Sequence, residues 1–254
     1  MNLVICGFGR AGKSLVEMII NSKVNQLEMV ICRRNSINMN KDVGQILFGY
    51  KNGINIIPID KAKTILKGKR IDVVIDFSHH DMTQELLNLC GEIRSNLVIC
   101  TTNHSAEEIS RLEHMADKHK IGVVYCPNLT VGINLLMDFV KRVSMIFPNY
   151  EFDILEKHPK GKKKPTATAK MLAKAARDDE ISIHSVRMDG YIGVHQITIT
   201  DGIERITLVH ESLSRQAFAK GAILAAEYIQ GKTGFFRMED VIHHLESFDK
   251  SNTL

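Results

Sequence analysis

The chain has no long apolar stretch and no marked excess of either charge. Its 254 residues include 33 basic and 29 acidic side chains, a balance too even to indicate nucleic-acid binding. No run approaches the ~18 apolar residues that span a bilayer, and no charged region followed by a long apolar stretch opens the chain. We therefore expect a cytoplasmic protein with neither nucleic acid nor membrane among its partners.

Cysteine is also scarce, and its distribution excludes two kinds of cross-linked scaffold. The five cysteines are odd in number, widely spaced and set mainly in apolar, strand-like runs: Cys6, Cys32, Cys90, Cys100 and Cys126. This pattern fits neither a disulfide framework nor a zinc cluster. The histidines show no i, i+4 pairing of the kind that binds a metal ion on a helix. We predict reduced thiols and no metal site.

A glycine turn is the first motif that carries chemistry, and it comprises Gly7, Phe8, Gly9, Arg10, Ala11 and Gly12. It follows an apolar strand at Leu3–Cys6, and a helix and a second strand at Leu27–Cys32 complete a βαβ unit. The glycines permit a tight turn and a close approach of backbone N–H groups to a pyrophosphate, whose charge the helix N-terminus favours. The unit predicts a dinucleotide-binding site.

The acidic residue that usually binds the ribose 2′-hydroxyl after the second strand is missing. Arg33 and Arg34 stand there instead. Guanidinium groups bind a 2′-phosphate through paired hydrogen bonds, whereas two solvated loop arginines would have no such role. We therefore predict NADPH as the preferred cofactor, with NADH possible.

Apolar strands continue to alternate with helices at Ile71–Phe77, Leu97–Cys100 and Gly122–Tyr125, which indicates a parallel sheet covered on both faces. Ligands bind such sheets at the carboxyl ends of the strands. The cofactor contacts expected there are Phe77, Ser78, Cys100, Thr101, Thr102, Pro127 and Asn128. Ser105 with Glu108 forms a predicted capping box, a structural feature of the next helix.

The pattern changes near Leu129, where helices begin to alternate with strands that read as antiparallel. Asp201-Gly202 predicts a two-residue hairpin turn, and a final helix near Ser214–Gln230 precedes a short tail. The predicted fold is α/β, with a Rossmann-type doubly wound parallel sheet and a second α+β domain with a mostly antiparallel sheet. We expect a dinucleotide-binding domain at 1–128, completed by 214–254, and a substrate-binding and oligomerisation domain at 129–213.

A lysine-rich segment at Glu156–Lys170, EKHPKGKKKPTATAK, combines a histidine, several lysines and a Pro-Thr-Ala-Thr turn. The unperturbed pKa of histidine suits proton transfer near neutral pH. A lone histidine of this kind is usually a buried structural residue, but an apolar strand that ends in His158 followed by lysines would be an unusual core, so we predict a functional role. A lysine can donate a proton when neighbouring cations lower its pKa. Thr168 is the expected anion contact and Thr166 the expected N-cap. The segment predicts a site for a small anionic substrate.

Taken together, these motifs resemble the dihydrodipicolinate reductases (4-hydroxy-tetrahydrodipicolinate reductases) of bacterial lysine biosynthesis. The similarity runs nearly end to end. It rests on GFGRAG, VVIDFS, CTTN, CPNLTVGIN, EKHPKGKKKPTATA, the spacing Arg187-x-x-Gly190-x-x-Gly193-x-His195 and SRQAFAKGAILAAEYIQGKTGFF.

The resemblance implies a reaction and an assembly. In this family a hydride passes from NAD(P)H to a cyclic unsaturated imine with two carboxylates, water is lost, and a neighbouring carbon receives a proton. The family's active-site histidine falls on His158 and its proton-donating lysine on Lys162. Its carboxylate-binding S-G-T segment falls on Thr166, Ala167 and Thr168. A homotetramer built from the middle-domain sheets is expected.

The lysine-rich segment departs from the family pattern in four ways, one of which is the absence of the aspartate that precedes the family's Ala-Pro. Pro159 replaces a second histidine, Ala167 replaces the S-G-T glycine, and the segment is one residue shorter, so that Lys163 competes with Lys162 for the role of donor. Two alternatives follow. One is a diverged imine or amino-acid dehydrogenase of the same architecture, such as an aspartate dehydrogenase; the other is a non-catalytic, NADPH-binding regulatory paralogue.

Overall fold

A computed structural model describes residues 1–177 and 181–251. The chain divides into two compact units. Unit 1 comprises Met1–Leu129 and Phe218–Leu254, and unit 2 comprises Thr130–Ala217.

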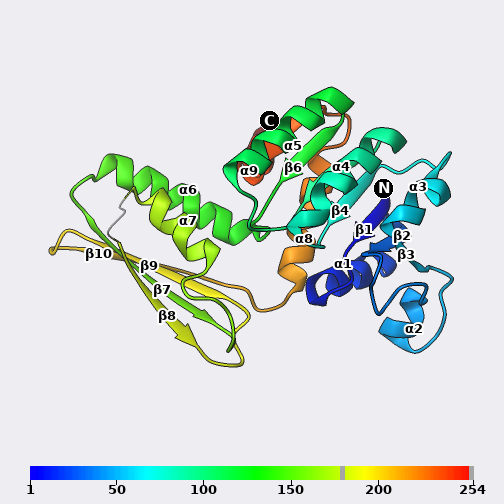
Figure 1. The fold of residues 1–254 in the computed structure, drawn as a ribbon. Helices are drawn as coiled ribbons and strands as arrows, with labels where there is room; N and C mark the ends of the chain where they lie inside the picture. Colours follow the sequence, from blue (N-terminus) through cyan, green and yellow to red (C-terminus); the bar gives the residue numbers. More distant parts are fainter. Residues whose placement is uncertain (178–180, 252–254) are drawn as a thin grey trace. The chain divides into compact units, whose positions relative to one another are not determined.

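Unit 1 contains a seven-stranded, fully parallel sheet with the order β11-β6-β5-β4-β1-β2-β3 (Figure 1). Its strands are β1 Asn2–Cys6, β2 Gln26–Cys32, β3 Ile56–Pro58, β4 Val73–Asp76, β5 Asn96–Ile99, β6 Gly122–Tyr125 and β11 Gly234–Arg237. The central strands are apolar on both sides, and all residues of β4 and β6 are buried. Such strands require helices on both faces of the sheet.

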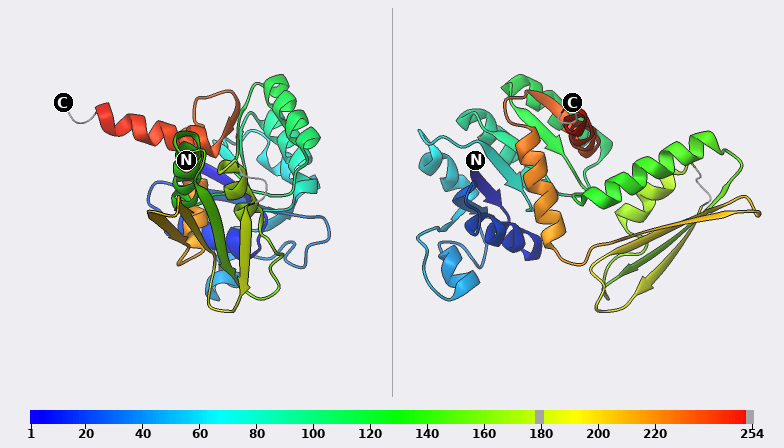
Figure 2. Two further views of the ribbon diagram at one scale, coloured as in Figure 1. Left: turned by 90° about the vertical axis from the view of Figure 1, so that its left-hand side faces the viewer. Right: turned by 180° about the vertical axis from the view of Figure 1, so that it is seen from behind.

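The helices supply that cover. The helices of unit 1 are α1 Arg10–Ile20, α2 Val43–Phe48, α3 Ile59–Leu66, α4 His80–Ile93, α5 Ala106–His119, α8 Gln216–Tyr228 and α9 Met238–Ser251. Helices α3, α4 and α5 bury apolar side chains in one core cluster with the sheet. Helices α1 and α8 lie on the opposite face (Figure 2). Ser105 caps α5 with the predicted capping box to Glu108, which is therefore confirmed.

Two parts of unit 1 were not predicted. The first contains α2, β3 and α3, whose strand has only three residues and ends in a proline. The second is the supposed tail, where β11 pairs with β6 at the sheet edge and α9 follows. The prediction of a short tail was wrong because the pairing partner of β11 lies more than a hundred residues earlier in the chain.

Unit 2 contains a four-stranded sheet with the order β10-β9-β7-β8. Its strands are β7 Glu151–His158, β8 Ser182–Arg187, β9 Val194–Thr200 and β10 Arg205–Glu211. Only the β7–β8 pair is parallel among these three pairings. Helices α6 Val131–Ile146 and α7 Ala167–Ala175 pack on one face of the sheet (Figure 1). The two sheets confirm the predicted fold class.

The hairpin between β9 and β10 was predicted correctly, but its turn is longer than two residues. Thr200 pairs with Arg205, so residues 201–204 form the connection. The Asp201 carboxylate closes it by accepting hydrogen bonds from the backbone N–H groups of Ile203 and Glu204, each at 2.9 Å. This side-chain closure stabilises a longer loop than the Asp-Gly pair alone requires.

Two sequence features can be located directly in the fold. All five cysteines are buried and carry free thiols. Among the residues that the structure describes, no helix combines the length and apolar character needed to cross a bilayer.

Candidate active site

The glycine turn between β1 and α1 is closed by backbone contacts that leave no room for side chains. A Cβ atom added to Gly7 would lie 2.5 Å from the carbonyl oxygen of Phe77, and Gly7 has a φ of +95°. A Cβ added to Gly12 would lie 2.1 Å from the carbonyl oxygen of Gly7. Both distances are far shorter than real contacts, so both positions require glycine.

Gly9 differs from the other two glycines because the space around it is open. An added Cβ would meet nothing within 4 Å. Gly9 is the N-cap of α1, and it supplies no side-chain hydrogen bond to the first turn, which also lacks an acidic residue. The amides of this turn, from Arg10 to Gly12, therefore suit an external anion. The turn fits the pyrophosphate of a dinucleotide.

A pocket of about 770 Å³ opens beside this turn. It brings together several predicted cofactor contacts, namely Gly7, Phe8, Gly9, Arg33, Arg34, Phe77 and Ser78. The same pocket is lined by two acidic residues of α4, Asp81 and Glu85. Sequence reasoning missed these acids because α4 is distant in sequence from the arginines.

Each of the two arginines lies beside one of these acids. Arg34 donates two hydrogen bonds to the Glu85 carboxylate, and Arg33 lies with its Nη2 3.7 Å from Oδ1 of Asp81. Both arginine side chains are more than half exposed. Exposed ion pairs contribute only about 0–1 kcal/mol unless their geometry is ideal, as in a bidentate arginine–carboxylate pair, so the Arg33–Asp81 pair is the weaker of the two.

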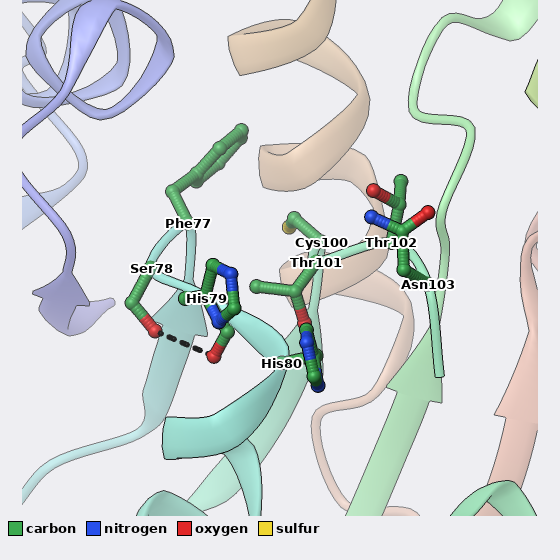
Figure 3. A pocket seen from close by; sticks show the side chains of 8 residues that line it. All are labelled: Phe77, Ser78, His79, His80, Cys100, Thr101, Thr102 and Asn103. Carbon is green, nitrogen blue, oxygen red and sulfur yellow. Dashed lines mark hydrogen bonds between the residues drawn. The ribbon is translucent and has the colours of Figure 1, made fainter. Parts of the chain in front are cut away.

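A smaller pocket of about 180 Å³ lies at the carboxyl ends of β4 and β5 (Figure 3). Its walls are Phe77–His80 from one strand end and Cys100–Asn103 from the other. It therefore includes the predicted contacts Cys100, Thr101 and Thr102. The predicted contacts Pro127 and Asn128 follow β6 and line neither of these two pockets.

A buried carboxylate organises this strand end. Asp76 accepts hydrogen bonds from the backbone N–H and hydroxyl of Ser78 and from the hydroxyl of Thr83 at 2.9 Å. Thr83 in turn contacts the hydroxyl of Thr101 at 3.2 Å and Nε2 of His104 at 3.1 Å. Burial raises the pKa of Asp76, although these hydrogen bonds oppose the shift. Asp76 therefore fixes Ser78 and, through Thr83, supports Thr101.

In unit 2 the core face of the sheet changes from apolar to polar towards one end. Along β7 the inward residues Phe152 and Ile154 are followed by Glu156 and His158. Glu156 pairs in register with Ser185 on β8 and with His195 on β9, while His158 pairs with Arg187. Strand register and the N-cap of α7 thus assemble the buried polar cluster, defined here as Glu156, His158, Thr166, Ser185, Arg187 and His195.

Glu156 is the centre of this cluster and is fully buried. Its carboxylate accepts hydrogen bonds from Ser185 Oγ at 2.6 Å, from Arg187 Nη2 at 2.6 Å, and from both the backbone N–H and the hydroxyl of Thr166. Burial opposes ionisation, but these donors outweigh it and lower the pKa of Glu156 to about 2. Glu156 is therefore ionised at neutral pH.

The two histidines of the cluster are in contact and are both neutral at pH 7. Nε2 of His158 lies 3.3 Å from Nε2 of His195. Burial and the neighbouring His158 lower the pKa of His195 to about 3, although Glu156 opposes this shift. Burial, followed by the charges of Arg187 and Lys162, also lowers the pKa of His158 against the influence of Glu156. His158 is thus buried and in contact with His195.

The remaining predicted substrate residues surround the start of α7. Thr166 is the N-cap of that helix, as predicted, and its hydroxyl accepts a hydrogen bond from the Ala169 N–H at 3.3 Å. Ala167 is exposed and Thr168 is half-buried. Lys162 and Lys163 are both exposed. Of the two lysines, Lys162 has a charge that contributes to lowering the pKa of His158.

Glu156, His158 and His195 offer three metal-ligating atoms within 4.8 Å of one another, a grouping that sequence spacing did not reveal. The Arg187 guanidinium, however, already lies 2.6 Å from the carboxylate. A divalent cation would have to displace this positive charge and the Ser185 and Thr166 hydrogen bonds. The donor set therefore suits a guanidinium better than a metal ion.

Two models of known protein families match the chain, one over its N-terminal part and one over its C-terminal part. The model of the dihydrodipicolinate reductase N-terminus matches residues 1–129, and the model of the C-terminus matches residues 132–242. The chain belongs to the dihydrodipicolinate reductase family. This confirms the resemblance inferred from the motifs and makes the protein a member of a family of oxidoreductases in lysine and diaminopimelate biosynthesis. The N-terminal model also implies a nicotinamide cofactor.

Individual relatives of the dihydrodipicolinate reductase family cover almost the whole chain. The 4-hydroxy-tetrahydrodipicolinate reductase of Methanopyrus kandleri is 30% identical over 264 residues, covering 94% of this chain and 95% of the relative. The protein of the same name from Methanosarcina mazei is 31% identical over 259 residues, covering 94% and 97%. A solved structure of dipicolinate-bound dihydrodipicolinate reductase from Paenisporosarcina sp. TG-14 has the same fold, with a TM-score of 0.78, 22% identity and coverage of 93% and 97%.

Proposed function

We propose that the protein reduces 4-hydroxy-tetrahydrodipicolinate to tetrahydrodipicolinate with NADPH. The observation that carries this proposal is the family match across both halves of a single chain, because it joins an intact dinucleotide turn to the lysine-rich segment. The substrate is a small dicarboxylate. The nicotinamide supplies the hydride when it is bound, and the chain must supply anion binding and a proton.

Lys162 is the proposed proton donor, and His158 is its proposed catalytic partner. Lys162 is exposed, which a donor to an external substrate requires, and its charge acts on the neutral His158. Lys163 is adjacent in sequence and also exposed, and it would bind a substrate carboxylate.

The start of α7 is the proposed seat of the other carboxylate. Thr166, Ala167 and Thr168 lie at the N-cap and in the first turn, and that turn contains no acidic residue that would repel an anion. Both the hydroxyl and the backbone N–H of Thr166 are already engaged by Glu156, so Ala167 and Thr168 in the first turn are the better candidates.

NADPH is the proposed cofactor because Arg33 and Arg34 line the larger pocket. Arg33→Glu combined with Arg34→Ala should lower the ratio of kcat/KM for NADPH to that for NADH by about tenfold or more, since each phosphate contact is a charge-assisted hydrogen bond. An unchanged ratio would show that the two arginines do not determine the preference for NADPH over NADH.

The decisive test is NADPH oxidation by pure protein, with the product of dihydrodipicolinate synthase as substrate. Lys162→Ala should lower kcat by about 10²–10⁴-fold if it removes the general acid, and Lys163→Ala should mainly raise KM. The reverse pattern would make Lys163 the donor. A cofactor-bound protein without turnover would exclude the reductase proposal.

Pro159 and Ala167 favour a second candidate, a diverged dehydrogenase of an imine or amino acid such as aspartate. Amine-dependent reduction of NADP without activity on the dicarboxylate would identify it. NADPH binding with neither activity, unaffected by His158→Ala, would instead identify a non-catalytic regulatory paralogue.

We also propose a homotetramer assembled through the unit 2 sheet. The supporting observation is the side of that sheet opposite α6 and α7, where β8 and β10 expose Val186 and Val209 at 40% and 58%. Sedimentation velocity provides the test, and Val209→Lys should shift the protein towards smaller species. A monomer at all concentrations would contradict the proposal.

A further inference from the structure

Arg187 is a buried arginine at the end of β8 that bonds to the loop carrying both candidate donor lysines. Its side chain is only 7% exposed. Besides the Glu156 carboxylate, it donates from Nε to the carbonyl oxygen of Lys162 at 2.9 Å and from Nη2 to the carbonyl oxygen of Lys163 at 2.7 Å. A single guanidinium therefore joins a buried carboxylate to two consecutive carbonyl groups.

These two bonds are short compared with the other backbone contacts of the lysine loop, defined here as residues 159–165. The N–H of Lys162 reaches the Pro159 carbonyl at 3.4 Å, and the N–H of Lys160 reaches Asp189 at 3.3 Å. The loop contains no acidic residue of its own. Among the residues that the structure describes, Arg187 thus makes the shortest hydrogen bonds to the backbone from which Lys162 and Lys163 project.

Glu156 makes this arrangement possible because it holds the guanidinium and compensates its charge. A buried arginine without a partner would be strongly unfavourable, and the additional Ser185 and Thr166 donors keep the carboxylate ionised and fixed. The planar fork of arginine can reach one carboxylate and two carbonyls at once, whereas the compact ammonium of lysine cannot.

We propose that Arg187, anchored by Glu156, is a positioning residue that aims Lys162 by fixing the Lys162 and Lys163 carbonyl groups. The inference rests on the proposed reductase function and adds to it the residue that holds the proton donor in place. A misplacement of about 1 Å can cost about 10²-fold in rate, so loss of the two carbonyl bonds should impair proton transfer.

The test uses Arg187→Lys in the full chain, because lysine retains a positive charge for Glu156 and so protects folding. We expect kcat to fall between about tenfold and 10²-fold. The solvent deuterium isotope effect on kcat should increase, while the Kd for NADPH stays unchanged. Hydrogen–deuterium exchange of the peptide covering residues 159–165 should accelerate.

Ser185→Ala is the matched control, since it removes another donor to Glu156 but no bond to the loop. It should lower the unfolding temperature without faster exchange in the loop and without a larger isotope effect. Equal loop exchange in Arg187→Lys and wild type would overturn the positioning role, and so would the same acceleration in Ser185→Ala.

The exchange measurement does not require turnover, and it therefore separates the two proposals. If wild type lacks reductase activity but loop exchange accelerates only in Arg187→Lys, the reductase proposal fails and Arg187 still positions the loop. If wild type is active but loop exchange and the isotope effect stay unchanged in Arg187→Lys, the positioning role fails alone.

Discussion

The glycine turn of unit 1 and the buried polar cluster of unit 2 are built in different ways. The turn consists of consecutive residues, and its shape depends on backbone atoms that approach too closely for any Cβ at Gly7 or Gly12. The cluster consists of side chains from three strands and a helix N-cap, with an ionised carboxylate at its centre. The turn should therefore respond to added volume, and the cluster to changes in charge.

Glu156→Ala should have the largest effect on stability. It would leave the Arg187 guanidinium buried without its carboxylate, which typically costs about 3–5 kcal/mol. Urea unfolding followed by circular dichroism measures the loss. The double variant Glu156→Met with Arg187→Met should recover much of it, because an apolar pair leaves no unpaired charge. A double variant less stable than Glu156→Ala would contradict this explanation.

Gly12→Ala tests whether the glycine turn of unit 1 is sensitive to added volume. The added methyl group would overlap a backbone oxygen, so we expect a loss at or above the ~1–3 kcal/mol typical of overpacking, together with loss of NADPH binding. Gly9→Ala is the control, since its Cβ enters open space. It should retain the unfolding temperature and weaken NADPH binding about tenfold by obstructing the pyrophosphate. Equal unfolding temperatures for the two variants would refute the distinction.

The pH dependence of stability should come partly from His195. Its pKa is about 3 in the folded chain and near 6.5 when unfolded, so below pH 6.5 the unfolded chain binds more protons. Stability due to this group is present above pH 6.5 and is lost as pH falls towards 3, by up to about 1.4 kcal/mol per pH unit.

His195→Gln should reduce this slope in urea titrations between pH 6.5 and 5. Glu156 does not affect the slope in this range. Its folded pKa of about 2 lies below its ordinary value near 4.5, so its stabilisation is complete above pH 4.5 and is lost as pH falls between these values. A slope as steep in the variant as in wild type would assign the effect to other histidines.

Substitutions at two helix N-caps should cause the smallest expected losses of stability. Ser105→Ala removes an exposed capping box and should cost about 0.5–2 kcal/mol. Thr166→Ala removes a cap whose hydroxyl also serves the buried Glu156, and it should cost more. Thermal unfolding of the two variants provides the comparison, and an equal loss would show that the cluster adds nothing to capping.

Sites made of residues that are close in sequence could be predicted, whereas contacts between residues distant in sequence could not. The glycine turn, the arginines after β2 and the strand ends could be predicted because neighbouring residues carry the pattern, and the pockets bring most of them together. Asp81 and Glu85 were missed because they lie on a helix distant in sequence. The alternation in β7, with Phe152 and Ile154 followed by Glu156 and His158, was a visible signal that polar side chains would enter the core.

The sequence by itself determined the parallel sheet of unit 1, the family and the lysine-rich segment, since each depends on local periodicity or on contiguous motifs. Only the tertiary structure decided that β11 completes the first sheet and that Arg187 and His195 join Glu156 and His158. The reason is that strand register and non-local pairing set these contacts. They depend on which strands become neighbours, and no short stretch of the chain records that choice.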